Sequence, residues 1–184
     1  MALKAAPEAQ ALLLDLQAFD TKLAQLDHRA KSLPELATLA GFAKDADALR
    51  LTLGEQNGGL EDIKIELKRV ESDVEVVETR IARDTERLQG SSSVKDVSAL
   101  EQELTALRKR LGDLEEIELT VMERLEEQQT LVDNTMAAFD ALRARAAEVE
   151  VDRDAALASI AAERTTAAAG RAEVEAKVPA DLLA

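Results

Sequence analysis

The chain has 184 residues, of which 2 % are aromatic and 33 % are charged, and its formal net charge is −14. So few bulky apolar side chains do not fill an ordinary globular core, whereas a two-helix coiled coil needs only a narrow apolar seam. The excess of carboxylates argues against direct binding to nucleic acid or to an anionic membrane surface, because both are bound through clustered Lys and Arg.

The composition also limits the chemistry of these residues. The chain contains no cysteine, which excludes disulfides, thiolate chemistry and Cys-ligated zinc. It has no signal-peptide pattern and no run of about eighteen apolar residues, so we expect a cytoplasmic protein that does not enter a membrane. Glycine and proline are scarce and strong helix formers dominate, so almost the whole chain should be helical.

The first predicted helix covers residues 8–31 and begins after Pro7. Its apolar residues recur at spacings of three and four, as on one face of a helix; they are Leu12, Leu16, Phe19, Leu23, Leu26 and Ala30. The helix should end at Ser32-Leu33-Pro34, where Ser32 can cap a new helix that has Pro34 in its first turn. So short an interruption does not reverse the chain, and we predict a kink between nearly collinear helices.

The second predicted helix covers residues 35–88 and carries apolar residues on two rows with a spacing of seven. One row is Leu39, Ala46, Leu53, Leu60, Leu67, Val74, Ile81 and Leu88, and the other is Phe42, Leu49, Gln56, Ile63, Val70, Val77 and Asp84. Three glycines between Gly54 and Gly59 each cost a helix about 1 kcal/mol relative to alanine. Because Leu53 and Leu60 keep the same phase, we expect a continuous but weak helix here, with a short break as the alternative.

A turn is predicted within Gln89–Asp96, before a third helix over residues 96–177. This helix also carries two rows: Val97, Leu104, Leu111, Glu118, Leu125, Val132, Phe139 and Ala146, and Leu100, Leu107, Leu114, Val121, Gln128, Thr135, Leu142 and Val149. Apolar pairs that repeat about every 3.5 residues on both sides of one break indicate an antiparallel coiled coil. The predicted fold is all-α, a long kinked coiled-coil hairpin over residues 1–178, with 179–184 as the start of a further C-terminal segment.

The same rows predict which residues face each other. If the turn lies within 89–96, facing residues have numbers that sum to about 184 or 185. Gln56 then faces Gln128, and these two amides, able to hydrogen-bond to each other, are the predicted register pair. The first helix should lie along the third, with Phe19 or Leu23 near residues 160–167.

Three segments resemble bacterial coiled-coil proteins that end in a C4-type zinc ribbon: Val94–Leu104, Leu114–Leu125 and the opening Leu13–Asp20. The resemblance spans most of the chain and implies an elongated, kinked hairpin with a zinc module at its open end. After Val178-Pro179 the family continues into paired cysteines, which this sequence lacks. Either the sequence stops before the ribbon or this member has none, so zinc is expected only in the absent ribbon.

No residue pattern in the sequence indicates a catalytic, cofactor-binding or metal site. His28 is the single histidine and is interpreted as a surface residue. The acidic groups Glu115, Glu116, Glu118 and Glu123, Glu126, Glu127 match no calcium loop, so a solvated helix face explains them better than a cation site.

The predicted turn is slightly basic on an acidic chain. Between Arg80 and Arg110 there are seven basic and five acidic residues. Interleaved salt bridges are the simpler explanation of this balance, and a docking site for an acidic partner is the alternative. The candidate partner-binding residues are Arg83, Arg87, Ser91, Ser92, Ser93 and Lys95.

We therefore expect a non-enzymatic scaffold or adaptor that binds another protein. The resemblance implies regulation of transcription or secretion through protein partners. The alternative is that the hairpin is the spacer or dimerisation arm of a zinc-ribbon nucleic-acid-binding regulator. The protein could be a monomer or a homodimer, since apolar residues outside the two rows are available for a second copy; they are Leu51, Ile65, Val76, Ile117, Leu119 and Leu131.

Overall fold

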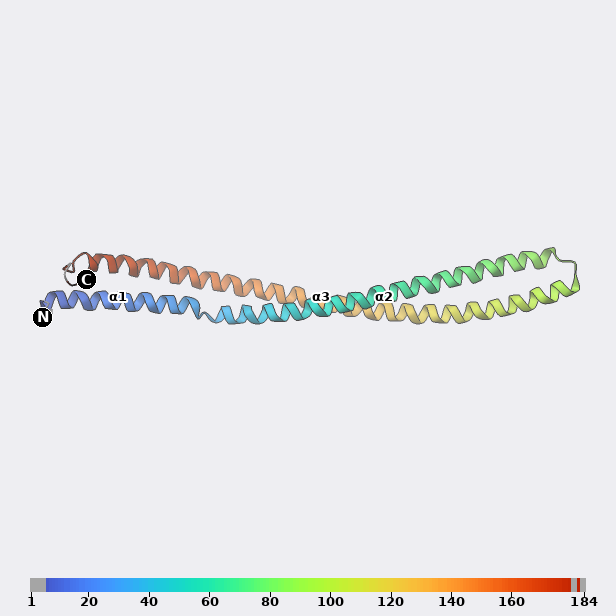
Figure 1. Cartoon of the computed structure of the whole chain (residues 1–184), viewed down its shortest axis with the longest axis horizontal. Coiled ribbons are helices and arrows are strands. Elements are labelled where there is room, and N and C mark those ends of the chain that lie inside the picture. The colour runs from blue at the N-terminus through green and yellow to red at the C-terminus, as the bar shows by residue number, and fades with distance from the viewer. Residues whose placement is uncertain (1–5, 180–181, 183–184) are drawn as a thin grey trace. The chain divides into compact units, whose positions relative to one another are not determined.

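The computed structural model describes residues 6–179 and 182. Three helices make up this part of the chain: α1 (Pro7–Lys31), α2 (Pro34–Gly90) and α3 (Val94–Glu175) (Figure 1). The described residues contain no strand, and the predicted all-α coiled-coil hairpin is confirmed. They form two compact units, which we call the hairpin unit (residues 47–140) and the terminal unit (residues within 1–46 and 141–184).

The hairpin unit contains the chain reversal. Residues 91–93 connect α2 to α3, inside the predicted Gln89–Asp96 interval. Ser93 begins α3, because its hydroxyl accepts a hydrogen bond from the Asp96 N–H at 3.4 Å. Its carbonyl accepts a second bond, from the Val97 N–H at 2.9 Å. A serine at this position satisfies amide groups that the first turn of a helix leaves without partners.

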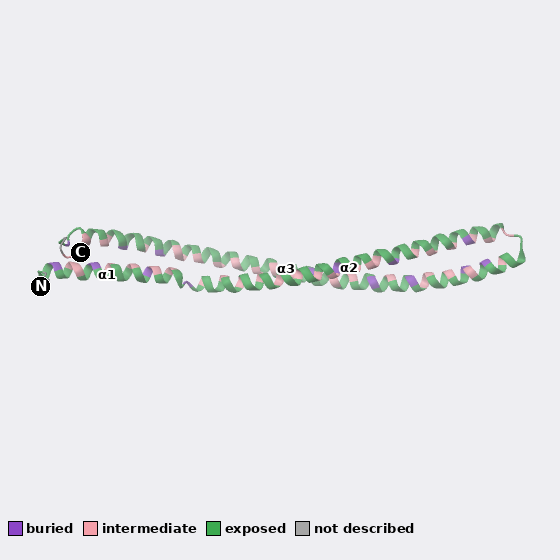
Figure 2. Ribbon diagram, in the orientation of Figure 1, coloured by how far each residue is buried: buried purple, intermediate pink, exposed green. Residues whose placement is uncertain are grey.

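The predicted heptad rows form the seam between the paired helices. Every residue of the four rows is buried or half-buried, as the stripes along α2 and α3 in Figure 2 show. Val121 and Leu104 are the most deeply buried of them, each with 2 % exposure. Full burial of one such side chain contributes about 1.5–3 kcal/mol, so the repeated layers are the main source of stability.

The break between α1 and α2 differs from the prediction in its capping residue. Ser32 ends α1 instead of starting α2: its hydroxyl donates to the His28 carbonyl at 2.9 Å. Leu33 precedes the first residue of α2, and its carbonyl accepts the Leu36 N–H at 3.1 Å. Because Pro34 is itself the first helical residue, the capping position falls on Leu33, whose side chain is buried. Tertiary packing therefore overrides the capping preference of serine.

The terminal unit confirms that α1 packs against α3. Leu26, Leu33, Ile160 and Ala167 form one buried cluster. Phe19, Leu23, Ala30, Ala156 and Leu157 pack against it, so the predicted contact of Phe19 and Leu23 with this part of α3 is correct. The alanines let the two backbones approach where α1 supplies the larger side chains.

Ion pairs flank this cluster and join the same two helices. Arg164 lies 3.1 Å from Asp27, Arg29 lies 3.3 Å from Glu163, and Arg171 lies 2.6 Å from Asp20. The hydrogen bond to Asp20 raises the pKa of Arg171 above its ordinary value, so this guanidinium stays charged. Pairs as exposed as these add little stability, and they favour the antiparallel alignment of α1 and α3.

Helix α3 ends two residues before the predicted Lys177. The Lys177 N–H donates to Val174 O at 2.9 Å, and the Val178 N–H donates to Glu175 O at 3.1 Å. These bonds span three residues, the tighter pattern common in the last turn of a helix. Pro179 has no N–H and stops any continuation. Of the predicted C-terminal segment 179–184, only Pro179 and Leu182 lie within the described residues.

The glycine-rich segment Gly54–Gly59 is helical throughout, because α2 is unbroken from Pro34 to Gly90. The alternative of a short break is therefore wrong, and the local weakness of the helix stays a prediction. An added Cβ would meet nothing within 4 Å at Gly54 or Gly58, whereas at Gly59 it would lie 3.3 Å from the Gln128 amide nitrogen. Of these three glycines, only Gly59 has a neighbouring side chain in the space that a Cβ would occupy.

The packing of Phe19 on Gly170 gives a test of the terminal unit. A Cβ at Gly170 would lie 2.7 Å from two ring atoms of Phe19. Gly170→Ala should therefore lower the free energy of unfolding, because overpacking costs about 1–3 kcal/mol and the gain in helix propensity is about 1 kcal/mol. In a Phe19→Ala background the same substitution should raise it by about 1 kcal/mol. Urea denaturation of the four proteins measures both effects, and equal effects in the two backgrounds would contradict this packing.

Candidate functional site

The described residues contain no group of three or more His, Asp or Glu side chains placed to hold a metal ion. No helix in this part of the chain is both long and apolar enough to cross a membrane. His28 is exposed and contributes its carbonyl to the end of α1, where Ser32 donates to it. Glu115, Glu116, Glu123, Glu126 and Glu127 are exposed, and Glu118 is half-buried in its row.

The predicted register pair lies together in the hairpin unit, with different bonding from that expected. The Gln128 side-chain nitrogen donates to the backbone carbonyl of Gln56 at 2.8 Å. The side-chain oxygen of Gln56 is buried without a hydrogen-bond partner. The expected bond between the two side-chain amides is therefore wrong. Gly59 gives the Gln128 amide room to approach the α2 backbone, because a Cβ there would lie 3.3 Å from its nitrogen.

Asp84 is a buried charge that sequence reasoning did not single out. It occupies an apolar row near the turn and is only 3 % exposed. Arg87 lies 3.2 Å from its Oδ1 and Arg80 lies 3.9 Å from its Oδ2, while Arg80 also pairs with Glu103 of α3. The signal in the sequence was an acidic residue inside an apolar row, with arginines four residues before and three residues after it.

Of the six residues that were predicted to bind a partner at the turn, three take part in an ion pair or in the hydrogen bonds that end α2 and begin α3, and three do not. Arg87 is engaged by Asp84, and Ser93 caps α3. The Ser91 N–H donates to the Leu88 carbonyl at 3.3 Å, which closes α2. The remaining three are Arg83, Ser92 and Lys95, all exposed. Within the described chain, neither Arg83 nor Lys95 takes part in an ion pair.

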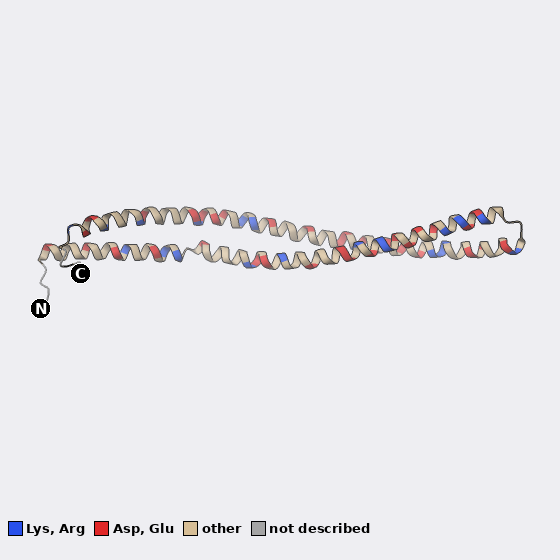
Figure 3. Cartoon of the chain, turned by 45° about the horizontal axis from the view of Figure 1, so that its top comes forward, with Lys and Arg blue, Asp and Glu red and all other residues tan. Residues whose placement is uncertain are grey.

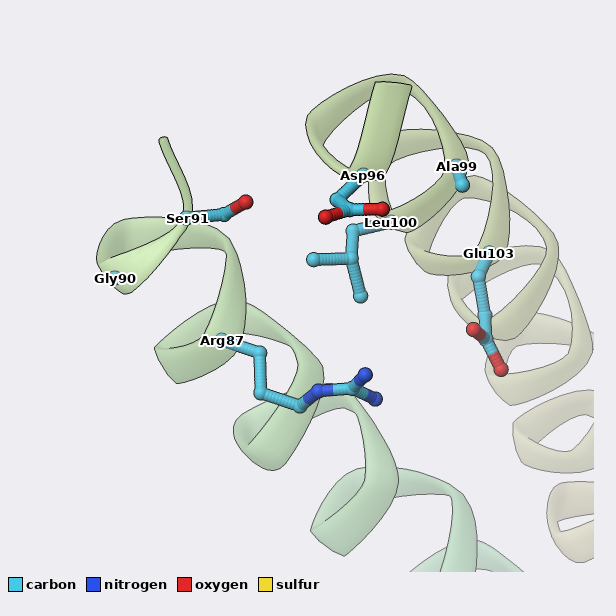
Figure 4. A pocket seen from close by; sticks show the side chains of 7 residues that line it. All are labelled: Arg87, Gly90, Ser91, Asp96, Ala99, Leu100 and Glu103. Atoms are coloured by element: carbon cyan, nitrogen blue, oxygen red, sulfur yellow. The ribbon is translucent and has the colours of Figure 1, made fainter. Parts of the chain in front are cut away.

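A groove at the turn is lined by residues of both helices and of the connection between them: Arg87, Gly90, Ser91, Asp96, Ala99, Leu100 and Glu103 (Figure 4). Figure 4 shows the Arg87 guanidinium extended from α2 toward Leu100 and Glu103 of α3. The carboxylates of Asp96 and Glu103 share this groove with a single cation. The groove is therefore not an anion site. Exposed cations without an ion pair in the described chain lie outside it: Arg83 and Lys95 next to the turn, and Arg108, Lys109 and Arg110 farther along α3.

Charge is unevenly distributed over the hairpin unit. Residues 80–110 carry seven basic and five acidic side chains, whereas residues 47–79 and 111–140 together carry five basic and eighteen acidic ones. Figure 3 shows basic residues on both helices next to the turn. The hairpin unit thus has a slightly basic end and a strongly acidic remainder, which we call the acidic stem.

Comparison with known proteins assigns the family. Residues 16–184 match the model of the CT398-like coiled coil hairpin domain. The chain belongs to this family. Its predicted place in a bacterial coiled-coil family is thereby confirmed, and the C-terminal zinc ribbon that the resemblance implied stays a prediction.

Comparisons with individual proteins show which sequences and structures are similar to this chain. The uncharacterized protein Rv2229c of Mycobacterium tuberculosis is 33 % identical over 159 residues, which cover 86 % of this chain. The chain spans 65 % of that protein's length. A solved structure from Mycobacterium smegmatis has a TM-score of 0.88 at 29 % identity, covering 98 % of this chain and 76 % of that one. CT398 from Chlamydia trachomatis shares the fold, with a TM-score of 0.67 at 18 % identity over 96 % of this chain and 74 % of that one.

The unpartnered oxygen of Gln56 leads to a stability prediction. Gln56→Leu removes a buried polar atom and fills the row with an apolar side chain, so the free energy of unfolding should rise by about 1 kcal/mol. The Gln128 bond should persist, because it uses the backbone of residue 56. Gln102→Leu, at an exposed position of α3, is the control and should change stability by less than about 0.5 kcal/mol. A loss of stability in Gln56→Leu, measured by urea denaturation, would show that its amide is satisfied in solution.

The division of roles at the turn gives a second prediction. Arg87→Ala should lower the free energy of unfolding by about 1 kcal/mol, because it removes the nearest cation from a buried carboxylate. Arg83→Ala, at an exposed neighbouring position of the same helix, should change it by less than about 0.5 kcal/mol. Thermal denaturation of the two variants makes the comparison. Equal losses of stability in the two variants would show that the ion pair of Arg87 with Asp84 does not stabilise the fold.

Proposed function

We propose that the chain is a non-enzymatic helical scaffold or adaptor that binds another protein through the turn of its hairpin unit. The observation that carries the proposal is the presence of exposed cations without intramolecular partners at the turn of a strongly acidic unit. Membership of a coiled-coil hairpin family supports the structural, non-enzymatic part of the proposal.

The turn suits an acidic protein surface. Arg83 and Lys95 lie on α2 and α3, on opposite sides of the connection, and Ser92 lies between them in sequence with an exposed side chain. Arg80 and Arg87 hold Asp84 and Glu103, so they position the helix ends without contributing free charge. A partner with carboxylates opposite Arg83 and Lys95 would gain charge-assisted hydrogen bonds.

The acidic stem restricts where an acidic partner can bind to the hairpin unit. An acidic partner is repelled by residues 47–79 and 111–140, so its approach is favoured only near the turn. Such complementarity acts mainly on the association rate and on specificity, and it weakens as salt screens the charges. Regulation of transcription or secretion through such a partner is the process implied by the family resemblance.

The test compares charge reversal at the turn with charge reversal elsewhere. The tagged full-length protein is purified from its native host as wild type, as Arg83→Glu/Lys95→Glu and as the control Lys44→Glu/Arg143→Glu. Both control residues are exposed, lie in the terminal unit and take part in no ion pair within the described chain. A partner that co-purifies in a fixed ratio is identified, and its affinity is measured by calorimetry with purified components.

We expect the turn variant to bind the partner about tenfold more weakly, which corresponds to ~1.4 kcal/mol, and the control to bind within about twofold of wild type. Equal affinities of all three proteins would show that the turn is not the binding surface. Failure of the wild-type protein to retain any partner in a fixed ratio would overturn the adaptor proposal.

A further inference from the structure

A second surface of the hairpin unit has the features of a protein-binding groove. It lies between α2 and α3, far along the sequence from the turn, and four apolar side chains line it: Leu67, Leu119, Met122 and Leu125. Leu67 and Leu125 belong to the seam and are half-buried, so they form the floor. Leu119 and Met122 are 61 % and 49 % exposed, although neither belongs to a heptad row.

Acidic side chains form one edge of this groove. Glu123, Glu126 and Asp133 line it from α3, and Asp133 also accepts a hydrogen bond from the Gln129 amide at 2.9 Å. The single cation of the lining is Lys64, which Glu61 holds at 2.7 Å on α2. An apolar strip next to uncompensated carboxylates attracts a ligand that is apolar on one face and positively charged beside it.

The neighbouring groove on α3 provides a contrast. Its lining residues are Ile117, Thr120 and Val121, the carboxylates Glu66, Asp113 and Glu116, and the single cation Arg124. There the Arg124 guanidinium bridges to Glu66 of α2 at 3.0 Å, so a cation of the chain itself already crosses between the helices. The groove at Leu119 and Met122 has no such bridge among its described lining residues. The groove at Leu119 and Met122 is therefore not crossed by a cation of the chain, and its apolar floor and its carboxylates are available to a ligand.

The groove has the length of a short helix. At about 1.5 Å per residue, α3 extends about 21 Å from Leu119 to Asp133, which corresponds to about four turns of a helix lying alongside it. A helix of that length presents apolar anchors at spacings of three and four residues, which match a strip of this kind. Extended peptides are less suited, because the paired helices offer no sheet edge for backbone hydrogen bonds.

We propose that this groove binds a basic amphipathic helix of another protein, with apolar side chains on Leu67, Leu119, Met122 and Leu125 and with Lys or Arg beside Glu123, Glu126 and Asp133. The inference rests on the proposed function as a protein-binding scaffold and assigns a surface separate from the turn. A second copy of the chain fits less well, because residues 47–79 and 111–140 of both copies carry a large excess of carboxylates and repel each other.

The test uses two synthetic helical peptides with the same leucine pattern, one with lysines and one with glutamates at the flanking positions. Their binding to the full chain is measured by fluorescence anisotropy. The charge variant Glu123→Lys/Glu126→Lys is matched by Glu148→Lys/Asp152→Lys, which makes the same change in net charge at exposed positions of α3 in the terminal unit. The apolar variant Leu119→Ser/Met122→Ser is matched by Leu131→Ser/Met136→Ser, at exposed positions of α3 outside the groove.

We expect the lysine peptide to bind and the glutamate peptide not to bind. Each groove variant should weaken binding about tenfold, and each matched control should stay within about twofold of wild type. Circular dichroism should show unchanged helix content, because all of the substituted side chains are exposed. If the groove and control charge variants weakened binding of the lysine peptide equally, the binding would be an unspecific attraction between opposite charges, and the proposal would be wrong.

Two further measurements separate this proposal from its alternatives. If sedimentation equilibrium shows a dimer that Leu119→Ser/Met122→Ser dissociates, the groove is an interface between copies of the chain, and the proposal is wrong. The turn variant Arg83→Glu/Lys95→Glu should bind the lysine peptide as well as wild type does. Loss of peptide binding in the groove variants and loss of the native partner in the turn variant are thus independent results.

Discussion

The seam formed by two apolar residues in every seven is the constraint on which the rest of the structure depends. Apolar burial has no direction, but a stripe this narrow is covered completely only by another helix with the same repeat. The chain provides that helix by reversing at residues 91–93 and by placing α1 along the end of α3. Within the hairpin unit the core is only one layer of side chains wide, and no residue outside the rows is buried there.

Polar residues within the seam favour one alignment of the paired helices, which leucine and valine alone do not select. Apolar layers alone tolerate a shift of one helix by a whole repeat. The bond from Gln128 to the Gln56 carbonyl exists at one alignment only, and Gly59 leaves room for the Gln128 amide beside it. Asp84 acts similarly near the turn, where Arg80 links it to Glu103 of the facing helix. Such groups lower stability relative to an apolar layer and oppose alternative alignments.

The distribution of charge connects the fold to its proposed function. Arginines at Arg80 and Arg87 neutralise a buried carboxylate, whereas Arg83 and Lys95 are left without a partner in the described chain. In the proposals made above, the carboxylates of the acidic stem favour a basic partner and the cations at the turn favour an acidic one. The two proposed surfaces differ in chemistry, as we expect for a scaffold that binds two different proteins.

The helical class, the place of the turn, the kink near Pro34 and the facing of Gln56 and Gln128 could be predicted from the sequence, because a seven-residue repeat and its interruptions are local properties of the chain. The atoms that form the hydrogen bonds and ion pairs at those positions could not be predicted in this way and are known from the packed helices. The tertiary structure assigned the cap to Leu33, the Gln128 bond to a backbone carbonyl and Arg87 to Asp84, and it placed Leu119 and Met122 beside Leu67 of the other helix. These outcomes depend on the distance between two helices and on side-chain conformations, which the spacing of residues along one chain does not encode.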